Sequence, residues 1–349
     1  MKPALIFQNY YTPARDALFR KMVEQGQVLT VLYMHLPSDE GRRWSEPTDL
    51  PYTSVQMPHF AFGPVILFWV PFAFWRWRGP VIATDNNPTN IAMLLWCFAF
   101  RAFGCRIGMW IEHIPDAYKG SAKLAYQTTC TRVLCALSHR ILAFSAMTIR
   151  YLQDIAPTAK IDRMVQATPM DGPFAPPRPT RGLRRFGYLG SADERKNVAA
   201  LRQAFAMLDD PTVQLHLAGF EQQDDAPRTH WYGYIDGSAR EDFFAAIDIL
   251  VLPSLADPWG FVVNEALARG ALAIVTNRCG SAELVEKVDP ALVCDVTPAS
   301  IAAALRHAIS LDSYTVEQIH LRAREAMDAY GMDAAVARII HHAEAVDAR

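Results

Sequence analysis

The chain has 349 residues, more than the roughly 250 to 300 that a single hydrophobic core usually supports, so the length predicts two domains. With 51% hydrophobic and 20% charged residues and no low-complexity tract, the composition excludes an intrinsically disordered protein. Residues 1–170 hold 17 Lys and Arg against 11 Asp and Glu, a net charge of +6, whereas residues 171–349 hold 17 against 25, a net charge of −8. The basic half favours an anionic membrane surface or an anionic substrate, although solvated faces alone can produce such a difference.

In the first half of the chain, short apolar runs alternate with segments of helical length. The expected strands are residues 4–8, 28–33, 80–84, 106–111 and 140–144, and the expected helices are residues 15–24, 90–103 and 122–137. This alternation predicts a parallel sheet covered by helices. The opening MKPALIFQNYY has no signal-peptide pattern, which predicts a protein that stays in the cytoplasm.

One segment of the first half departs from the alternation. Phe60–Gly79 (FAFGPVILFWVPFAFWRWRG) is apolar over about seventeen residues and contains two internal prolines, near the lower limit for a bilayer span. We expect a helix at the membrane interface, with the Trp and Arg residues at 75–78 at headgroup depth. The alternative is a helix in the core of the first domain.

A proline-rich stretch separates two regions of the chain. Residues 167–182 (ATPMDGPFAPPRPTRG) hold five prolines and two glycines, a composition typical of a linker. Beyond it, strands are expected at residues 185–189, 213–218, 249–253 and 272–276, and helices at residues 199–208, 241–246 and 261–269. We expect an N-terminal domain over residues 1–168, a linker over 169–182, a second domain over 183–330, and a C-terminal helix over 331–349 that can cross back to the first domain. Two doubly wound α/β domains of this kind bind ligands at the carboxyl ends of their strands, in a cleft between them.

The most informative stretch is Val251–Val285 (VLPSLADPWGFVVNEALARGALAIVTNRCGSAELV). A strand ends at Pro253, Asp257 follows in a turn, and a helix starts near Gly260 with Glu265 inside it. Backbone N–H groups at such a helix start can hold an anion, and two acids can accept hydrogen bonds from sugar and ribose hydroxyls. This pattern alone is common to many nucleotide binders.

The whole segment resembles the signature of family-four retaining glycosyltransferases of the GT-B fold, in which an acid, seven residues and a second acid precede a small-residue helix and a Gly-Ser or Gly-Gly turn. Here the acids are Asp257 and Glu265, with Asp in place of the usual first Glu. RRFGYLGSADERKN resembles the first strand of the family's second domain and puts Lys196 at its phosphate-binding lysine. HWYGYID, which includes Tyr234, resembles the segment that contacts the nucleobase, and RIGMWIEHIPD resembles the strand that ends in the family's cleft histidine, here His113.

Two departures from the family pattern concern the donor and the acceptor. Ser191 replaces an arginine that follows the first strand of the second domain, and Arg195 is the candidate to substitute for it. NYYTPARD replaces the Gly-rich turn after the first strand of the chain, where Tyr side chains prevent close backbone approach. We therefore expect Asn9 and Arg15 to serve the acceptor.

The resemblance implies a retaining, metal-independent hexosyltransferase with two Rossmann-like doubly wound domains that face a central cleft. It would move a hexose from a UDP- or GDP-linked sugar to a lipid-linked, polysaccharide or glycolipid acceptor in cell-surface glycan synthesis. The catalytic residues would be His113, Asp257 and Lys196; the donor-binding residues Glu265, Ser191, Arg195, Gly260, Phe261, Val262 and Tyr234; and the acceptor-binding residues Asn9 and Arg15.

The resemblance also implies a set of partners. No Asp-x-Asp motif follows an expected strand, so neither a metal ion nor a cofactor is expected. The expected partners are the nucleotide-sugar donor, the glycan acceptor and an anionic membrane surface, without nucleic acid, at the inner face of the cell membrane. The alternative is a non-catalytic GT-B subunit that binds a nucleotide-sugar or scaffolds a membrane glycan-assembly complex; Ser191 favours it, and the acid pair with Lys196 opposes it.

Overall fold

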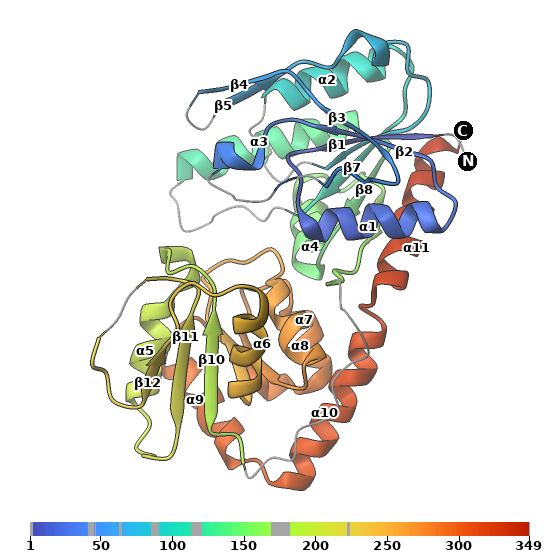
Figure 1. The fold of residues 1–349 in the computed structure, drawn as a ribbon. Helices are drawn as coiled ribbons and strands as arrows, with labels where there is room; N and C mark the ends of the chain where they lie inside the picture. The colour runs from blue at the N-terminus through green and yellow to red at the C-terminus, as the bar shows by residue number, and fades with distance from the viewer. Residues whose placement is uncertain are drawn as a thin grey trace. The chain divides into compact units, whose positions relative to one another are not determined.

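The computed structural model describes residues 3–40, 45, 47–62, 65–84, 91–112, 121–168, 182–221 and 224–348. The chain divides into two compact units: Met1–Pro169 together with Met332–Arg349 form unit 1, and Met170–Gly331 forms unit 2. Each unit is built on a parallel sheet with helices against it (Figure 1). The linker expected at residues 169–182 lies outside the described residues, apart from Gly182.

Unit 1 contains a seven-stranded sheet in the order β3-β2-β1-β6-β7-β8-β9, with every neighbouring pair parallel. The strands are β1 Ala4–Gln8, β2 Leu29–Tyr33, β3 Thr53–Gln56, β6 Val81–Thr84, β7 Ile107–Ile111, β8 Arg140–Ala143 and β9 Ile161–Arg163. All residues of β1, β6 and β7 are buried, as the continuous apolar runs of a sheet covered on both faces predict. The strand order reverses between β1 and β6, so the loop after β1 lies at a switch point of the kind where such sheets bind ligands.

The helices of unit 1 include one from the far end of the chain. They are α1 Pro13–Glu24, α2 Ile91–Ala102, α3 Ser121–Leu137, α4 Ala146–Ile155 and α11 Met332–Asp347, with a short 3-10 turn η1 at Pro37–Glu40. In α11, His342 Nδ1 lies 2.7 Å from Oδ2 of Asp162, a residue of β9. Helix α11 also packs on α1, β7 and β8, so unit 1 is assembled from two separate segments of sequence.

The helix expected at Phe60–Gly79 is wrong. The segment instead forms an antiparallel hairpin, β4 His59–Phe62 with β5 Val65–Phe68, followed by a 3-10 turn η2 at Phe72–Phe74. The sequence contains a physical reason, because Gly63-Pro64 interrupts any helix here and the β-branched residues that follow favour a strand. Both helical interpretations of the segment therefore fail, at the interface and in the core.

Unit 2 contains a six-stranded parallel sheet in the order β12-β11-β10-β13-β14-β15. The strands are β10 Arg185–Leu189, β11 Gln214–Ala218, β12 Thr229–Trp231, β13 Ile249–Leu252, β14 Leu272–Thr276 and β15 Val293–Cys294. The helices are η3 Glu194–Lys196, α5 Val198–Ala206, α6 Gly237–Ala246, α7 Phe261–Ala268, α8 Ala282–Val288, η4 Pro290–Leu292, α9 Pro298–Ser310 and α10 Ser313–Asp328. The order reverses between β10 and β13, which places the loops after these two strands side by side.

None of the helices in the described ranges has both the length and the apolar character needed to cross a bilayer.

Candidate functional site

Two loops at the switch point of unit 2 are joined by an ion pair. Lys196 Nζ, in η3 after β10, lies 2.6 Å from Oδ2 of Asp257, in the loop after β13. The backbone ties the same loops together, because Leu255 N–H donates to Arg195 O at 2.8 Å. With side chains only 17% and 8% exposed, the two charges are held in one geometry. The structure thus brings together the residues expected to bind phosphate and sugar hydroxyls.

The Asp257 backbone is fixed from its other side by the loop after β14. Its N–H donates to Arg278 O at 3.0 Å, and its carbonyl accepts from Gly280 N–H at 2.9 Å. Its second carboxylate oxygen accepts from Trp259 N–H at 3.3 Å. The carboxylate therefore keeps its position independently of Lys196.

Helix α7 begins directly beside this carboxylate. Gly260, the residue before the helix, has a φ of +85°, and a Cβ there would overlap the Leu252 side chain and lie 3.8 Å from Asp257 Cγ. Only glycine fits this position. Phe261 and Val262 follow as the first helical residues, whose N–H groups have no partner within the helix and carry the positive end of its dipole. A cation and a helix start therefore flank one small region, which suits a doubly charged ligand.

Two buried serine hydroxyls that were not expected at the site belong to the surrounding loops. Ser254 Oγ and Ser281 Oγ are buried and have no hydrogen-bond partner among the described residues. Ser281 Oγ lies 3.5 Å from the point where a Cβ on Gly260 would be. Buried polar atoms without partners are uncommon, and a bound ligand is one way to satisfy them. Neither serine was given a role from the sequence, since their positions depend on how the loops after β13 and β14 meet.

Glu265 is paired with a cation that was not expected from the sequence. Arg240 of α6 forms a salt bridge to Glu265 Oε2, and the Glu265 side chain is 13% exposed. Arg269 donates to the Glu265 carbonyl at 3.1 Å. A carboxylate has acceptor sites on both oxygens, so Oε1 retains capacity for a ligand hydroxyl while Arg240 holds Oε2.

Asn264 of α7 is fully buried. Its Oδ1 accepts a hydrogen bond from Trp259 Nε1 at 2.7 Å. Trp259 is itself buried and needs an acceptor for its indole N–H, which Asn264 supplies.

An acidic side chain lies next to Ser191, where the family pattern implies a basic one. Its hydroxyl donates to Asp193 Oδ2 at 2.6 Å, and Tyr188 OH donates to its carbonyl at 2.5 Å. Burial alone would raise the pKa of Asp193, but the Ser191 hydrogen bond and the nearby Arg195 and Lys196 cations outweigh it and lower the pKa. Arg195 lies 3.8 Å from Asp193 and 3.9 Å from Asp257, so two carboxylates already surround the candidate substitute cation.

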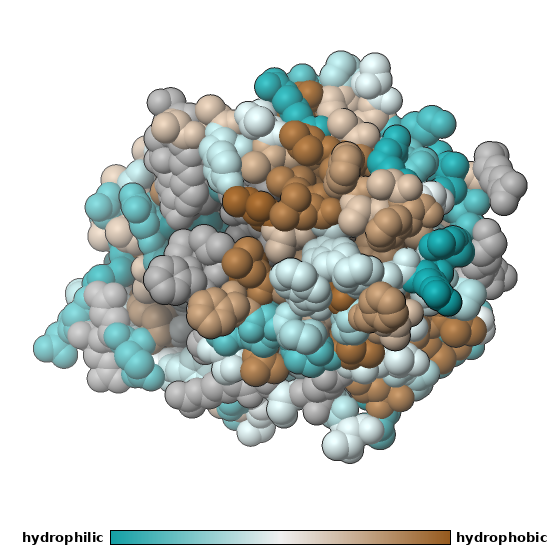
Figure 2. Space-filling view, turned by 90° about the horizontal axis from the view of Figure 1, so that it is seen from above, coloured by the Kyte–Doolittle hydropathy of each residue, from teal (hydrophilic) through white to brown (hydrophobic). Residues whose placement is uncertain are grey.

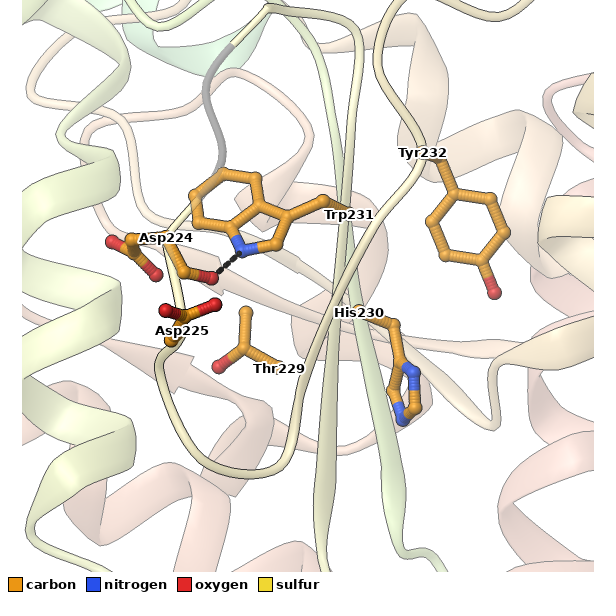
Figure 3. A pocket seen from close by; sticks show the side chains of 6 residues that line it. All are labelled: Asp224, Asp225, Thr229, His230, Trp231 and Tyr232. Atoms are coloured by element: carbon orange, nitrogen blue, oxygen red, sulfur yellow. Dashed lines mark hydrogen bonds between the residues drawn. The ribbon is translucent and has the colours of Figure 1, made fainter.

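A cavity of about 600 Å³ runs along β12, the outermost strand of the sheet (Figure 3). Its lining residues are Asp224, Asp225, Thr229, His230, Trp231 and Tyr232. Trp231 Nε1 donates to Asp224 O at 3.2 Å, which holds the indole over one side of the strand. Tyr234, two residues beyond the cavity, is 70% exposed and its N–H donates to Glu221 Oε1 at 3.3 Å. The segment expected near a nucleobase therefore presents aromatic side chains.

In unit 1, Arg15 lies against the end of β7 rather than on the surface. Its guanidinium forms a salt bridge to Glu112 and lies 5.4 Å from the Trp110 ring and 5.1 Å from the Phe144 ring. Burial lowers the pKa of Arg15 to about 10, so the side chain keeps its charge at neutral pH. Arg15 thus anchors Glu112, the residue before His113, and His113 itself lies outside the described residues.

A polar cluster at the carboxyl ends of β1, β2 and β3 was not expected from the sequence. His59 Nε2 lies 2.9 Å from Asp39 Oδ2, the same oxygen that accepts from Leu36 N–H at 2.8 Å. The His35 ring lies 5.1 Å from the Tyr10 ring. Asn9 belongs to the same edge, because its carbonyl accepts from His35 N–H at 3.0 Å. Polar side chains at three neighbouring strand ends were the available signal.

Comparison with known proteins adds to this geometry. Residues 184–310 match the family model of glycosyl transferases group 1. No curated protein sequence matches the chain.

Solved structures resemble the whole chain at low sequence identity. Sucrose-phosphate synthase from Thermosynechococcus elongatus has a TM-score of 0.71 at 13% identity, over 98% of each chain. WaaG, a glycosyltransferase involved in lipopolysaccharide biosynthesis, has a TM-score of 0.67 at 13% identity, over 99% of this chain and all of that one. A UDP-forming trehalose-phosphate synthase from Burkholderia xenovorans has a TM-score of 0.67 at 13% identity over the full length of both. At these identities the likeness establishes the fold.

Proposed function

We propose that the chain, which has the GT-B fold, is a group 1 glycosyltransferase that transfers a hexose with retention of configuration and without a metal ion. The observation that carries this proposal is the Lys196–Asp257 pair beside the start of α7. It supplies a cation, helix-start amides and a fixed acceptor of hydroxyl hydrogen bonds in one place. A nucleoside diphosphate joined to a sugar needs these three features together.

The donor diphosphate would lie against Lys196 and the first N–H groups of α7. Asp257 would accept hydrogen bonds from hydroxyls of the donor sugar, and Glu265 Oε1 would accept one from the ribose. Because Lys196 is already oriented by Asp257, little reorganisation is needed as negative charge develops on the leaving diphosphate. The aromatic residues around β12, with Tyr234, would contact the nucleobase.

In the transfer step, the bond between the sugar anomeric carbon and the diphosphate oxygen breaks, and its electron pair stays with the diphosphate. The acceptor hydroxyl oxygen bonds to that carbon on the face that the diphosphate leaves. Its proton passes to a diphosphate oxygen, so no protein base is required. The charge that remains on the nucleoside diphosphate is stabilised by Lys196 and the α7 amides.

The acceptor would bind at the strand ends of unit 1. The cluster of Asn9, Asp39 and His59 offers donors and acceptors for sugar hydroxyls at the switch point of that sheet. We assign Arg15 a positioning role through Glu112, in place of direct acceptor contact, since its side chain is only 9% exposed. WaaG and WaaB, two of the structural neighbours, act in lipopolysaccharide synthesis, which supports a lipid-linked or polysaccharide acceptor at the cytoplasmic face of a membrane.

A second candidate function, a non-catalytic subunit that binds a nucleotide-sugar, is favoured by one observation. Asp193 and Ser191 place a carboxylate where a diphosphate-binding arginine was expected. Repulsion between this carboxylate and the diphosphate would weaken the stabilisation of the leaving group.

A panel of UDP-, GDP- and ADP-sugars separates the two candidates. We expect one nucleotide series to raise the melting temperature, because a ligand that binds only the folded state stabilises it by about 2.7 kcal/mol at a hundred times its Kd. The same radiolabelled donor should then release free hexose or transfer it to added saccharides. A melting shift without any turnover would identify the non-catalytic subunit, and no shift with any donor would refute both functions.

Activity is expected to survive an excess of EDTA. Lys196 and the α7 amides carry the charge that a divalent ion carries in metal-dependent transferases. Initial rates with the preferred donor should agree within experimental error in EDTA and in added Mg²⁺ or Mn²⁺. Loss of activity in EDTA with recovery in a divalent ion would overturn the metal-independent mechanism.

A further inference from the structure

Seven large apolar side chains are exposed on one part of unit 1. Each is 52–74% exposed, and together they are Phe60, Leu67, Trp69, Phe72, Ile91, Leu95 and Phe98. We call this set the apolar face. It is carried by the β4–β5 hairpin, by the chain through η2 and by α2, and Figure 2 shows hydrophobic side chains gathered on this side of unit 1. A monomeric soluble protein rarely exposes so many large apolar side chains together, so the face indicates a binding surface.

The two elements of the apolar face are packed against each other. Trp96 Nε1 of α2 donates to Phe68 O of β5 at 3.2 Å, and the Trp75 and Trp96 rings lie 5.9 Å apart. Trp75 Nε1 donates to Val70 O at 2.9 Å, which ties the η2 turn to the end of the hairpin. The hairpin and α2 therefore form one supported surface.

The hairpin and α2 each have a buried side and an exposed side. In β5 and the residue after it, Phe68 is buried while Leu67 and Trp69 point outward. In α2, Ile91, Leu95 and Phe98 form an exposed apolar stripe at intervals of four and three residues. The opposite side of the helix is also apolar, and it is buried. The core of unit 1 is thus complete without the outward residues, and their apolar character needs another explanation.

The charged residues around the apolar face indicate which kind of partner binds there. Residues 51–111 contain four arginines, no lysine and a single acid, Asp85. Arg76 and Arg78, directly after η2, are exposed. Large apolar side chains bordered by Arg and Trp match the layers of a membrane surface, with the acyl boundary below and anionic headgroups above.

We propose that the apolar face docks unit 1 onto an anionic lipid bilayer, with the outward side chains of the hairpin and α2 at the acyl boundary and Arg76 and Arg78 among the headgroups. The proposal rests on the proposed function in taking the acceptor to be membrane-borne, but the docking does not require sugar transfer. The hairpin also starts at His59, whose side chain pairs with Asp39 in the polar cluster. A lipid-linked acceptor that leaves the bilayer along the hairpin would meet this cluster first.

Sedimentation with lipid vesicles tests the proposal. The full chain should bind vesicles of phosphatidylcholine with phosphatidylglycerol and bind vesicles of phosphatidylcholine alone several-fold more weakly. In the variant Trp69→Gln/Phe98→Gln, two outward aromatic side chains are lost, and the bound-to-free ratio should fall at least about tenfold. Arg76→Gln/Arg78→Gln should remove most of the preference for the anionic vesicles, while high salt should weaken wild-type binding only in part.

Matched controls separate membrane docking from general stickiness and from catalysis. Tyr314→Gln/Leu321→Gln removes two side chains of unit 2 that are similarly exposed, 71% and 52%, and should bind like the wild type. Trp69→Gln/Phe98→Gln should keep the melting temperature and the rate of donor hydrolysis, so docking and the proposed function fail separately. Equal vesicle binding by this variant and the wild type would overturn the proposal, as would a wild-type dimer in the absence of lipid that the variant cannot form.

Discussion

Lys196→Met is expected to lower kcat for sugar transfer by roughly 10²- to 10³-fold, the usual cost of removing one preorganised group that stabilises a developing oxyanion. The ammonium lies 2.6 Å from a fixed carboxylate beside the start of α7, so it is already held in position when charge develops on the diphosphate. Donor KM should change much less, because the charge on the diphosphate increases as the bond to the sugar breaks. Single-turnover kinetics with the preferred donor would separate the two effects.

The substitution also leaves the carboxylate of Asp257 buried without its partner, which can destabilise unit 2. The double variant Lys196→Met/Asp257→Asn removes both charges and should recover thermal stability without recovering transfer. Lys287→Met, which removes a lysine of unit 2 that lies over the Tyr330 ring, is the matched control and should keep wild-type turnover. Turnover by Lys196→Met close to that of the wild type would exclude Lys196 from the reaction.

Glu265→Gln is expected to lower kcat/KM for the donor by about 10²-fold, the value of a buried hydrogen bond to a charged group at the upper end of its range of about 1.5–3 kcal/mol. The loss should appear mainly in donor KM, since the ribose is remote from the bond that breaks. Steady-state kinetics with the preferred donor would measure it. A donor with 2′-deoxyribose should lose affinity for the wild type and much less for the variant.

Two neighbouring substitutions provide controls for Glu265. Arg240→Gln removes the cation that holds Oε2 and should cause a smaller loss, because the carboxylate stays in place but is less well oriented. Glu241→Gln removes an exposed acid of α6 that pairs with Arg269 and should leave donor kinetics unchanged. If Glu241→Gln and Glu265→Gln had the same effect, the loss would reflect the packing of α6 on α7 rather than ribose binding.

The central strands of both sheets were predictable because local sequence alone determines their burial, whereas the edge strands β3, β9, β12 and β15 were not expected. The bounds of β10 and β14 match the expected segments residue for residue, and α7 ends one residue before the expected end. Each is a mostly apolar segment with glycine or polar residues close to its ends, so its burial needs no knowledge of distant parts of the chain. The order of these alternating elements likewise predicted two doubly wound units.

The contacts of the site were less predictable because they depend on long-range pairing. Lys196 and Asp257 were expected at the site from a family resemblance, but their ion pair joins residues 61 positions apart and follows from the neighbouring positions of β10 and β13. Arg240 carries no motif, and only the packing of α6 beside α7 brings it to Glu265. The Phe60–Gly79 segment was wrongly predicted as a helix because its mean hydropathy suits a helix or a hairpin equally. The choice depends on the two helix-breaking residues Gly63 and Pro64.

The return of α11 to unit 1 has a consequence for the order in which the protein matures on the ribosome. A side chain at Gly108 in β7 would overlap His342 and Val346 of α11, so glycine leaves the space that this helix occupies. Helix α11 itself is synthesised after all of unit 2. At about 5–20 residues per second, translation of residues 170–331 delays that helix by roughly 10–30 s. Throughout this interval, the apolar surface of unit 1 on which Ala335, Val336 and Ile339 later pack stays exposed to solvent. Chaperone demand should therefore peak late in translation, and variants that slow the docking of α11 should lower the yield of soluble protein more than the activity of the molecules that mature.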